Sequence, residues 1–320
     1  MKAIVYKSTG SWYVVKPVAD VSATISSPGI PPTFNARLKG VFKMDGSMST
    51  NPIAVGDEVE IEMENELEGS VTITAICKRK NYVNRQSPRS EHHHHIIASN
   101  LDQSLLIATL KEPKTSQGFI DRFLVGCEAY HVPALIIFNK SDLFKEKELH
   151  KFEEFQETYE RIGYRVLKMS IEKNEGIEEV VSLLKDKVTL VSGHSGVGKS
   201  SFINNIFPEK KLLRTQEVSG WSGKGMHTTT FAEMFDLPFG GKIIDTPGIR
   251  EFGIVDIEKE ELSHYFPEMR RLLTNCQFNN CMHSNEPGCA VKEAVNNGTV
   301  STDRYVSYLT ILDTINKKKY

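Results

Sequence analysis

The chain has 320 residues, of which 25% are charged, and its formal net charge is -2. A chain of this length exceeds the usual size of one hydrophobic core, so we expect two or three domains. The near balance of charge excludes a global field that would draw the chain to nucleic acid or acidic lipid, and any such binding must use local patches. The sequence lacks an uninterrupted apolar run of membrane-spanning length and a signal-peptide pattern at its start, so we expect a cytoplasmic protein without membrane contact.

The N-terminal part has the pattern of a small all-β domain. Short runs of alternating apolar and polar residues predict strands, and turn signals separate them. The runs lie around Ile4 and Tyr6, and at Trp12 to Val15, Phe34 to Phe42, Val59 to Met63 and Val71 to Ile76. We therefore expect a five-stranded β-barrel over residues 1–80 and a linker over residues 81–97. The run His92 to His95 falls in this linker, where a solvated segment is the first interpretation and a metal site the alternative.

Residues 98–255 alternate between predicted strands and helices, which is typical of an α/β domain. The strand SLLIATL is followed by the helical stretch FIDRFLVGCEAYHV and by the strand PALIIFN. The strands YRVLKMS, VTLVS and GKIID continue the pattern. Between them, one set of apolar residues recurs at helical spacing and predicts a helix with a core-facing side: Leu149, Phe152, Phe155, Tyr159 and Ile162.

A guanine-recognition motif follows the strand PALIIF. It has the NKxD form and consists of Asn139, Lys140, Ser141 and Asp142. A carboxylate at this place can accept hydrogen bonds from both N1–H and the exocyclic amine of guanine, whereas adenine offers no such pair of donors. The tetrapeptide alone also fits a polar strand-to-helix loop, but a phosphate-binding loop in the same domain favours nucleotide recognition. Met169 and Ser170, after the next strand, are expected to support the base.

A phosphate-binding loop lies between the strand VTLVS and a predicted helix. It satisfies the G-x-x-x-x-G-K-[ST] pattern. Its backbone N–H groups would face the phosphates, Lys199 would reach the outer phosphates as a catalytic group, and Ser200 would bind Mg²⁺. The residues predicted to bind GTP here are Gly193, His194, Ser195, Gly196, Val197, Gly198, Lys199, Ser200 and Ser201.

Two further segments have the form of GTPase switches. In the D-x-x-G segment that begins at Asp245, the carboxylate would hold Mg²⁺ through water and the N–H of Gly248 would sense the γ-phosphate. Upstream, Thr228, Thr229 and Thr230 follow His227 in a glycine-rich stretch, and one of these threonines is a candidate Mg²⁺ ligand. The usual order in GTPases places NKxD last. Here NKxD comes first and D-x-x-G last, which indicates a circular permutation.

Three of the five cysteines lie in one short segment of the C-terminal region. Cys276, Cys281, His283 and Cys289 offer three thiolates and one imidazole, a set suited to tetrahedral structural Zn²⁺. Buried core cysteines are the alternative. Four protein ligands leave no open coordination position, which argues against a catalytic zinc.

Nearly the whole chain resembles a known family, the ribosome small-subunit-dependent circularly permuted GTPases of bacteria. The resemblance rests on TGSW, NPIAVGDEV, RKNY, GHSGVGKSS, the HTTT loop, DTPGIREFG and EPGCAV. It implies a multidomain fold: an OB-fold RNA-binding β-barrel over residues 1–80, a circularly permuted P-loop GTPase domain over residues 98–255, and a mostly α-helical zinc-binding domain over residues 256–320. The implied activity is slow GTP hydrolysis, stimulated by the 30S ribosomal subunit, during late maturation of that subunit. The implied partners are GTP and GDP, the 30S subunit and its 16S rRNA, and we expect a monomer.

The catalytic water and the RNA contacts need further residues. Many GTPases place a glutamine after D-x-x-G to orient water, but this chain has Ile249, so we expect slow hydrolysis and interpret His227 as the candidate catalytic group. A histidine that merely caps its loop is the alternative. A basic, aromatic-bearing barrel face would bind RNA, and its candidate residues are Lys7, Arg37, Lys39 and Lys43. A rival function is an RNA-binding assembly chaperone that uses GTP only as a conformational ligand.

Overall fold

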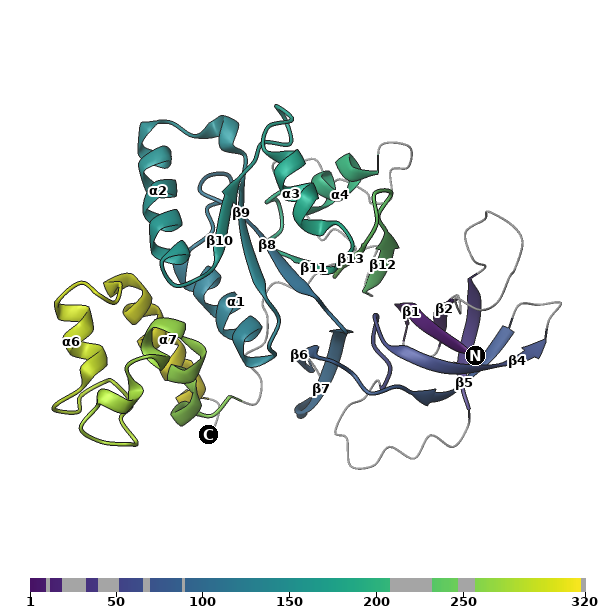
Figure 1. Ribbon diagram of the computed structural model, residues 1–320, viewed down its shortest axis with the longest axis horizontal. Coiled ribbons are helices and arrows are strands. Elements are labelled where there is room, and N and C mark those ends of the chain that lie inside the picture. The colour runs from purple at the N-terminus through teal and green to yellow at the C-terminus, as the bar shows by residue number, and fades with distance from the viewer. Residues whose placement is uncertain are drawn as a thin grey trace. The chain divides into compact units, whose positions relative to one another are not determined.

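The structure is a computed structural model that describes residues 1–9, 12–18, 33–39, 52–65, 70–87, 90–207, 232–246 and 257–317 (Figure 1). The chain divides into two compact units. The first unit contains Met1–Asp102, Leu184–Leu190 and Ser222–Gly248. The second contains Gln103–Leu183, Val191–Trp221 and Ile249–Tyr320. The GTPase region expected over residues 98–255 therefore contributes to both units.

The first unit contains a closed five-stranded barrel. Its strands are β1 (Lys2–Ser8), β2 (Tyr13–Pro17), β3 (Phe34–Leu38), β4 (Glu58–Asn65) and β5 (Ser70–Ile76). Their order is β1-β2-β3-β5-β4, and an additional pairing between β1 and β4 closes the barrel. Alternate residues point inward, so that Val5, Val15, Ile61 and Ile73 are buried in one core. The N-terminal β-barrel is confirmed.

Two β-hairpins complete the first unit. Strands β6 (Tyr82–Ser87) and β7 (Ser90–Ser99) pair antiparallel, so the segment that we expected to be a linker, residues 81–97, contains a hairpin. The buried carboxylate of Asp57 holds the base of this hairpin, because it accepts hydrogen bonds from Arg79 and Ser99, each at 2.6 Å. Strands β12 (Glu233–Asp236) and β13 (Lys242–Asp245) form the second hairpin, and β12 pairs with β1 of the barrel.

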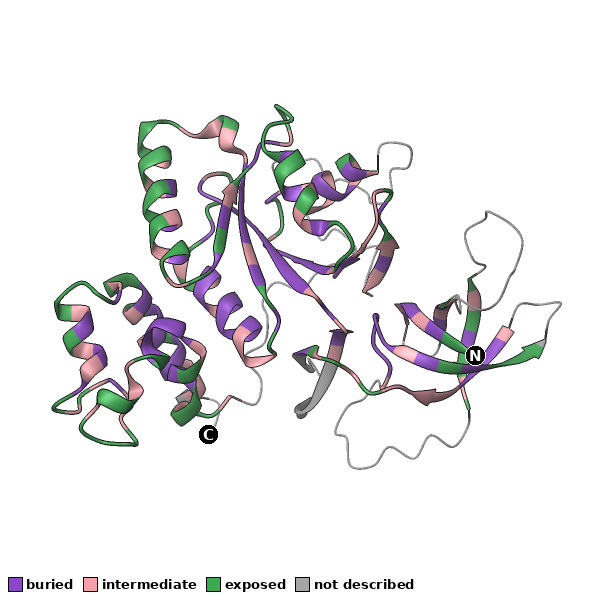
Figure 2. Cartoon of the chain, in the orientation of Figure 1, coloured by how far each residue is buried: buried purple, intermediate pink, exposed green. Residues whose placement is uncertain are grey.

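The second unit contains a parallel β-sheet with helices. Strands β8 (Gln103–Thr109), β9 (Ala134–Asn139) and β10 (Arg165–Lys168) pair in parallel, and every residue of β8 is buried (Figure 2). The elements that follow in the chain are α1 (Gln117–Ala129), the 3₁₀ helix η1 (Ser141–Leu143), α2 (Glu146–Glu160), α3 (Ile177–Leu184), β11 (Val188–Ser192) and α4 (Lys199–Ile206). Of these, Leu184 and the first three residues of β11 belong to the first unit. One core prediction is wrong: Leu149 of α2 is 40% exposed, although it lies three residues before the buried Phe152, because it is in the first turn of the helix, where the neighbouring layer does not cover it.

The C-terminal region is mostly helical, as predicted. Its elements are the 3₁₀ helix η2 (Lys259–Tyr265), α5 (Pro267–Arg270), the 3₁₀ helix η3 (Leu273–Asn275), α6 (Ala290–Asn296) and α7 (Thr302–Lys317). Phe266, Met269, Tyr308 and Ile311 form its core, and Val125 of α1 belongs to the same buried cluster. The helix α1 therefore supplies one wall of the C-terminal core (Figure 1).

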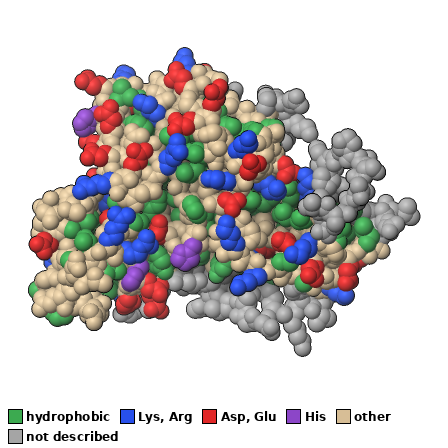
Figure 3. Space-filling view, viewed as in Figure 1, with side chains coloured by type: hydrophobic (Ala, Val, Ile, Leu, Met, Phe, Trp, Pro, Cys, Tyr) green, Lys and Arg blue, Asp and Glu red, His purple; other side chains and the backbone are tan. Residues whose placement is uncertain are grey.

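The surface agrees with the near-neutral composition. Figure 3 shows basic and acidic side chains interspersed on the visible face. Within the described ranges, none of the helices combines the length and apolarity that crossing a membrane would require.

Candidate nucleotide and metal sites

The phosphate-binding loop joins β11 to α4. Gly193 and Gly198 have φ values of 144° and 101°, which favour glycine. Space requires glycine as well: a β-carbon at Gly193 would lie 2.3 Å from the carbonyl oxygen of Ile107, and one at Gly198 would lie 2.3 Å from Nδ2 of Asn139. These two glycines therefore let the loop lie directly against the ends of β8 and β9.

Lys199 begins α4 and its side chain folds back over the loop. Its Nζ donates hydrogen bonds to the carbonyl oxygens of Gly193 and His194, at 2.6 and 2.8 Å. The ammonium group is thus positioned beside the loop whose N–H groups would hold phosphates. Ser200 and Ser201 follow in the first turn of the same helix.

The base-recognition motif lies at the C-terminal end of β9 and contacts the phosphate-binding loop. Asn139 is buried and its Nδ2 donates to the carbonyl oxygen of Val197 at 2.8 Å. Lys140 has a left-handed backbone with a φ of 63°, and its Nζ donates to the carbonyl oxygen of Glu112. The N–H of Ser141 donates to the carbonyl oxygen of Met169 at 3.1 Å. These bonds bring the NKxD segment, the segment at Met169 and the phosphate-binding loop together.

Asp142 is the carboxylate expected to read guanine. Its Oδ1 accepts a hydrogen bond from the hydroxyl of Ser170 at 2.5 Å, and the same hydroxyl accepts from the N–H of Lys173 at 3.1 Å. Ser170 is fully buried, whereas Asp142 is exposed. The buried hydroxyl thus fixes the orientation of an exposed carboxylate that is open to a ligand.

The predicted switch residues are described only in part. Asp245 ends β13 and belongs to the first unit, where it is 5% exposed. His227, Thr228, Thr229, Thr230 and Gly248 lie outside the described residues.

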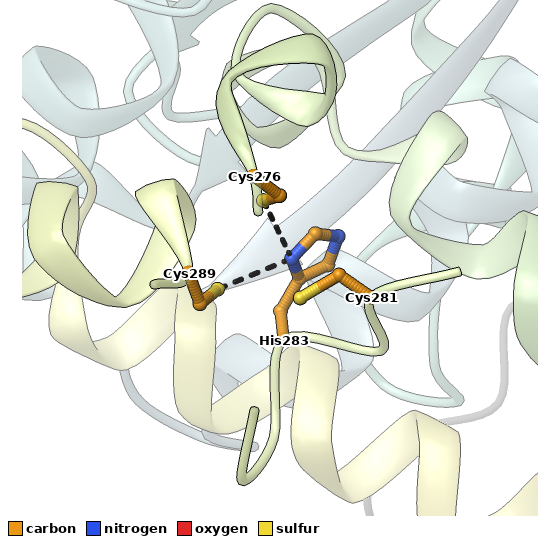
Figure 4. A group of neighbouring side chains, drawn as sticks. All are labelled: Cys276, Cys281, His283 and Cys289. Atoms are coloured by element: carbon orange, nitrogen blue, oxygen red, sulfur yellow. Dashed lines mark hydrogen bonds between the residues drawn. The ribbon is translucent and has the colours of Figure 1, made fainter. Parts of the chain in front are cut away.

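The four predicted zinc ligands lie together in the C-terminal region (Figure 4). One ligand atom from each of Cys276, Cys281, His283 and Cys289 lies within 4.8 Å of the others. Nδ1 of His283 lies 3.6 Å from Sγ of Cys276 and 3.3 Å from Sγ of Cys289. Three sulfur donors and one nitrogen donor at this spacing fit a tetrahedral metal ion.

The residues around these side chains fix the ligand loop and shift the pKa values of two candidate ligands. The hydroxyls of Tyr305 and Tyr308 donate to the carbonyl oxygens of His283 and Met282, at 2.6 and 2.7 Å, and so fix the loop that carries the histidine. Burial lowers the pKa of His283 and so favours the neutral imidazole, which is the form that binds metals. Burial also raises the pKa of Cys281, and the neighbouring thiols add to this shift, whereas a bound cation would favour the deprotonated form of this ligand.

The predicted RNA-binding residues occupy different environments on the barrel. The guanidinium of Arg37 lies over the ring of Trp12, 3.7 Å from its centroid, and Trp12 is 44% exposed. Lys7 pairs with Glu233 at 3.1 Å, and Lys39 lies 3.6 Å from Glu62. Lys43 falls outside the described residues.

A buried ionic cluster between α1 and the C-terminal region was not predicted from the sequence. Arg304 pairs with Asp121 at 2.7 Å and with Glu268 at 2.8 Å, and Tyr159 donates to the same Asp121 oxygen at 2.7 Å. The available signal was Asp121 itself, a charged residue inside the apolar stretch FIDRFLVG. Its partner could not be read from the sequence, because 183 positions separate the two residues.

Two family models and several known proteins match the chain. A family model described as the RsgA GTPase matches residues 76–255, and a model of the RsgA N-terminal domain matches residues 2–71. The chain is 49% identical to a small ribosomal subunit biogenesis GTPase RsgA of Flavobacterium psychrophilum, and the match covers 98% of this chain and 93% of the relative. It is 47% identical to the protein of the same name from Bacteroides fragilis, over 100% of this chain and 99% of the relative.

Two crystal structures share the fold. YjeQ from Thermotoga maritima superposes with a TM-score of 0.76 at 34% identity, covering 98% of each chain. YloQ, described as a circularly permuted GTPase, superposes with a TM-score of 0.73 at 27% identity, covering 100% of this chain and 96% of its own.

A phosphate-binding loop that follows its base-recognition motif in the chain defines a circularly permuted P-loop GTPase, an enzyme that hydrolyses GTP. Within this class, the chain belongs to the RsgA GTPase family.

Proposed function

We propose that this GTPase assists the biogenesis of the small ribosomal subunit. It would bind the 30S subunit through 16S rRNA during late maturation, as a monomer in the cytoplasm, and the subunit would stimulate its slow hydrolysis of GTP. The names of its relatives support this role, since they are small ribosomal subunit biogenesis GTPases. The chain matches them over nearly its full length, barrel and C-terminal region included.

The observation that carries the nucleotide assignment is the bond from Asn139 to Val197. It joins the base-recognition motif to the phosphate-binding loop at 2.8 Å. A ligand held by both segments must have a guanine base and a phosphate chain, and GTP or GDP has this form. Asp142 would accept from the base, and Lys199 would neutralise phosphate charge.

The metal-assisted part of the site would use residues of the phosphate-binding loop and of the D-x-x-G segment. Ser200 and Asp245 would hold Mg²⁺, which neutralises phosphate charge when it is bound with GTP. Thr228, Thr229 or Thr230 and the N–H of Gly248 would respond to the γ-phosphate. Ile249 cannot orient a water molecule, and His227 is our candidate for this role.

The cysteine and histidine cluster would hold one structural Zn²⁺ ion. Its donor set and the closeness of its ligand atoms support this assignment. Four protein ligands fill a tetrahedral shell, so the ion would stabilise the C-terminal region and take no part in hydrolysis.

The barrel would contact RNA through a local face. Trp12 and Arg37 support this proposal, because an exposed indole ring under a guanidinium offers both a stacking surface and a charge to a single-stranded nucleic acid. Lys39 and Lys43 would add phosphate contacts. Lys7 would do so only after it releases Glu233.

One measurement tests partner and activity together. We expect purified 30S subunits to raise GTP turnover, and we expect Lys199→Ala to abolish the stimulated turnover. Lys147→Ala is the matched control, since Lys147 is an exposed lysine of α2. If turnover stays negligible with 30S subunits while GTP still changes the affinity for them, the chain is instead an RNA-binding chaperone that uses GTP as a conformational ligand.

A further inference from the structure

The first turn of α1 contacts the phosphate-binding loop. The rings of Phe119 and His194 are tilted against each other with their centroids 3.6 Å apart. Pro113, in the segment that precedes the helix, lies beside the same loop, because a β-carbon added at Gly196 would be 3.4 Å from Cδ of Pro113. The loop is thus supported from α1 as well as from α4, which begins at its end.

The contact at His194 reaches the backbone that positions Lys199. The carbonyl oxygen of His194 accepts a hydrogen bond from Nζ of Lys199 at 2.8 Å. A ring that fixes the side chain of His194 therefore also restrains the peptide group on which the ammonium group rests. Phe119 is half-buried, and its ring lies against the ring of His194.

The rest of α1 is held by the C-terminal region, which contains the proposed zinc ligands. Asp121 pairs with Arg304 at 2.7 Å, Arg122 donates to the hydroxyl of Thr314 at 3.2 Å, and Glu128 pairs with Arg270 at 3.1 Å. Val125 lies in the core of the C-terminal region. Contacts from the second turn of α1 to its last turn therefore fix this helix to the C-terminal helices.

We propose that Phe119 is a positioning residue for the phosphate-binding loop and that α1 thereby couples nucleotide binding to the zinc-binding region. The proposal rests on the nucleotide site proposed above. The C-terminal region holds α1 through a buried ion pair, so α1 moves with that region. Through the ring of Phe119, α1 also restrains the phosphate-binding loop. Thermodynamic reciprocity then requires that a nucleotide which orders the loop also orders the C-terminal helices.

The experiment uses the full-length protein and GDP. Amide hydrogen exchange is measured with and without saturating GDP in the wild type and in Phe119→Ala, and GDP affinity is measured by fluorescence of a labelled analogue. We expect GDP to slow exchange in α1 and α7 of the wild type. In Phe119→Ala we expect the GDP-dependent change in α7 to disappear and GDP affinity to fall about twofold to tenfold, the size of an aromatic contact.

Two further variants separate coupling from folding. Phe119→Tyr keeps the ring and should restore both the affinity and the response of α7. Leu149→Ala removes an exposed apolar side chain of α2 and should leave both unchanged. A purely structural role for Phe119 would raise exchange in α7 equally with and without GDP.

Several outcomes would overturn the proposal. If GDP slows exchange in the loop of the wild type but not in α7, no coupling exists. If Phe119→Ala retains the full response of α7, the coupling does not pass through Phe119. If the wild type binds no GDP at all, the proposed nucleotide site itself fails, which is a separate result.

Discussion

The guanidinium of Arg304 and the carboxylate of Asp121 form an ion pair 2.7 Å apart, with side chains only 1% and 0% exposed. The guanidinium also reaches both carboxylate oxygens of Glu268, at 2.8 and 3.1 Å. One cation thus compensates two acids from different parts of the chain, and these three residues join α1, α5 and α7.

Arg304→Met should destabilise the protein strongly, because it leaves two buried carboxylates without a counter-charge. We expect the free energy of unfolding to fall by about 3–5 kcal/mol. Urea denaturation followed by far-ultraviolet circular dichroism measures this change. Arg165→Met is the control, since Arg165 and Glu179 form a pair about half exposed on both sides, and its loss should cost about 0–1 kcal/mol. Equal effects of the two substitutions would contradict the prediction.

Asp142→Asn should exchange the base specificity of the nucleotide site. An amide group can donate a hydrogen bond where the carboxylate accepts one. The variant side chain therefore loses the hydrogen bonds from N1–H and the exocyclic amine of guanine. It can instead donate to the carbonyl group that xanthine carries in place of that amine. We expect GTP affinity to fall about 10-fold to 100-fold, as for the loss of hydrogen bonds to a charged group, and XTP affinity to rise. Competition binding with both nucleotides measures this change.

Ser170→Ala should weaken GTP binding less than Asp142→Asn does. It leaves the carboxylate of Asp142 in place and removes the hydroxyl that orients it. We expect a smaller loss of GTP affinity, about twofold to tenfold, without a gain in XTP affinity. An unchanged GTP affinity in this variant would show that the hydroxyl of Ser170 does not position Asp142 for the base.

The elements that the sequence predicts well are those with a local signal. The barrel strands alternate with period two, and the phosphate-binding loop and NKxD each occupy consecutive positions. Contacts between distant residues carry no such signal. Arg304 reads as one more charged residue on a helix, and only the packing of α7 against α1 buries it beside Asp121. The exposure of Leu149 also depends on packing between elements. Helical spacing predicts one face of α2, but it does not show how far the neighbouring layer covers that face.

Metal removal should unfold the C-terminal region selectively. Cys289→Ser replaces a buried ligand by a much weaker one, and we expect bound zinc to fall from about one ion per chain to near zero. Because the ligand loop contacts Tyr305 and Tyr308, α7 should then become sensitive to limited proteolysis.

Cys77→Ser is the matched control for the metal site, since Cys77 lies outside the cluster. Elemental analysis and proteolysis should give the same result for this variant as for the wild type. Zinc content that survives in Cys289→Ser would contradict the assignment of the ligands.

Asp236 should make the first unit sensitive to acid. Its carboxylate accepts hydrogen bonds from Lys16 at 2.5 Å and from the hydroxyl of Tyr6 at 2.6 Å, and so connects β12 to two barrel strands. Partial burial alone would raise the pKa of Asp236, but the bonds from Lys16 and Tyr6 and the charges of Lys16 and Lys242 outweigh burial and hold the pKa below its ordinary value. The folded protein therefore binds this proton less tightly than the unfolded chain does.

The sign of the pH dependence follows from that difference. The stabilisation from Asp236 is complete above the unfolded-state pKa of about 3.9 and is lost as the pH falls through the lower folded-state pKa. Asp236→Asn cannot ionise, so its stability relative to the wild type should be lowest at neutral pH and should approach that of the wild type in acid. Urea midpoints between neutral pH and the acid limit of folding measure this convergence. Leu149→Ala, which removes an exposed apolar side chain and no titratable group, is the control, and its difference from the wild type should not change with pH. A constant difference for Asp236→Asn across the whole range would show that its carboxylate contributes no charge-dependent stability.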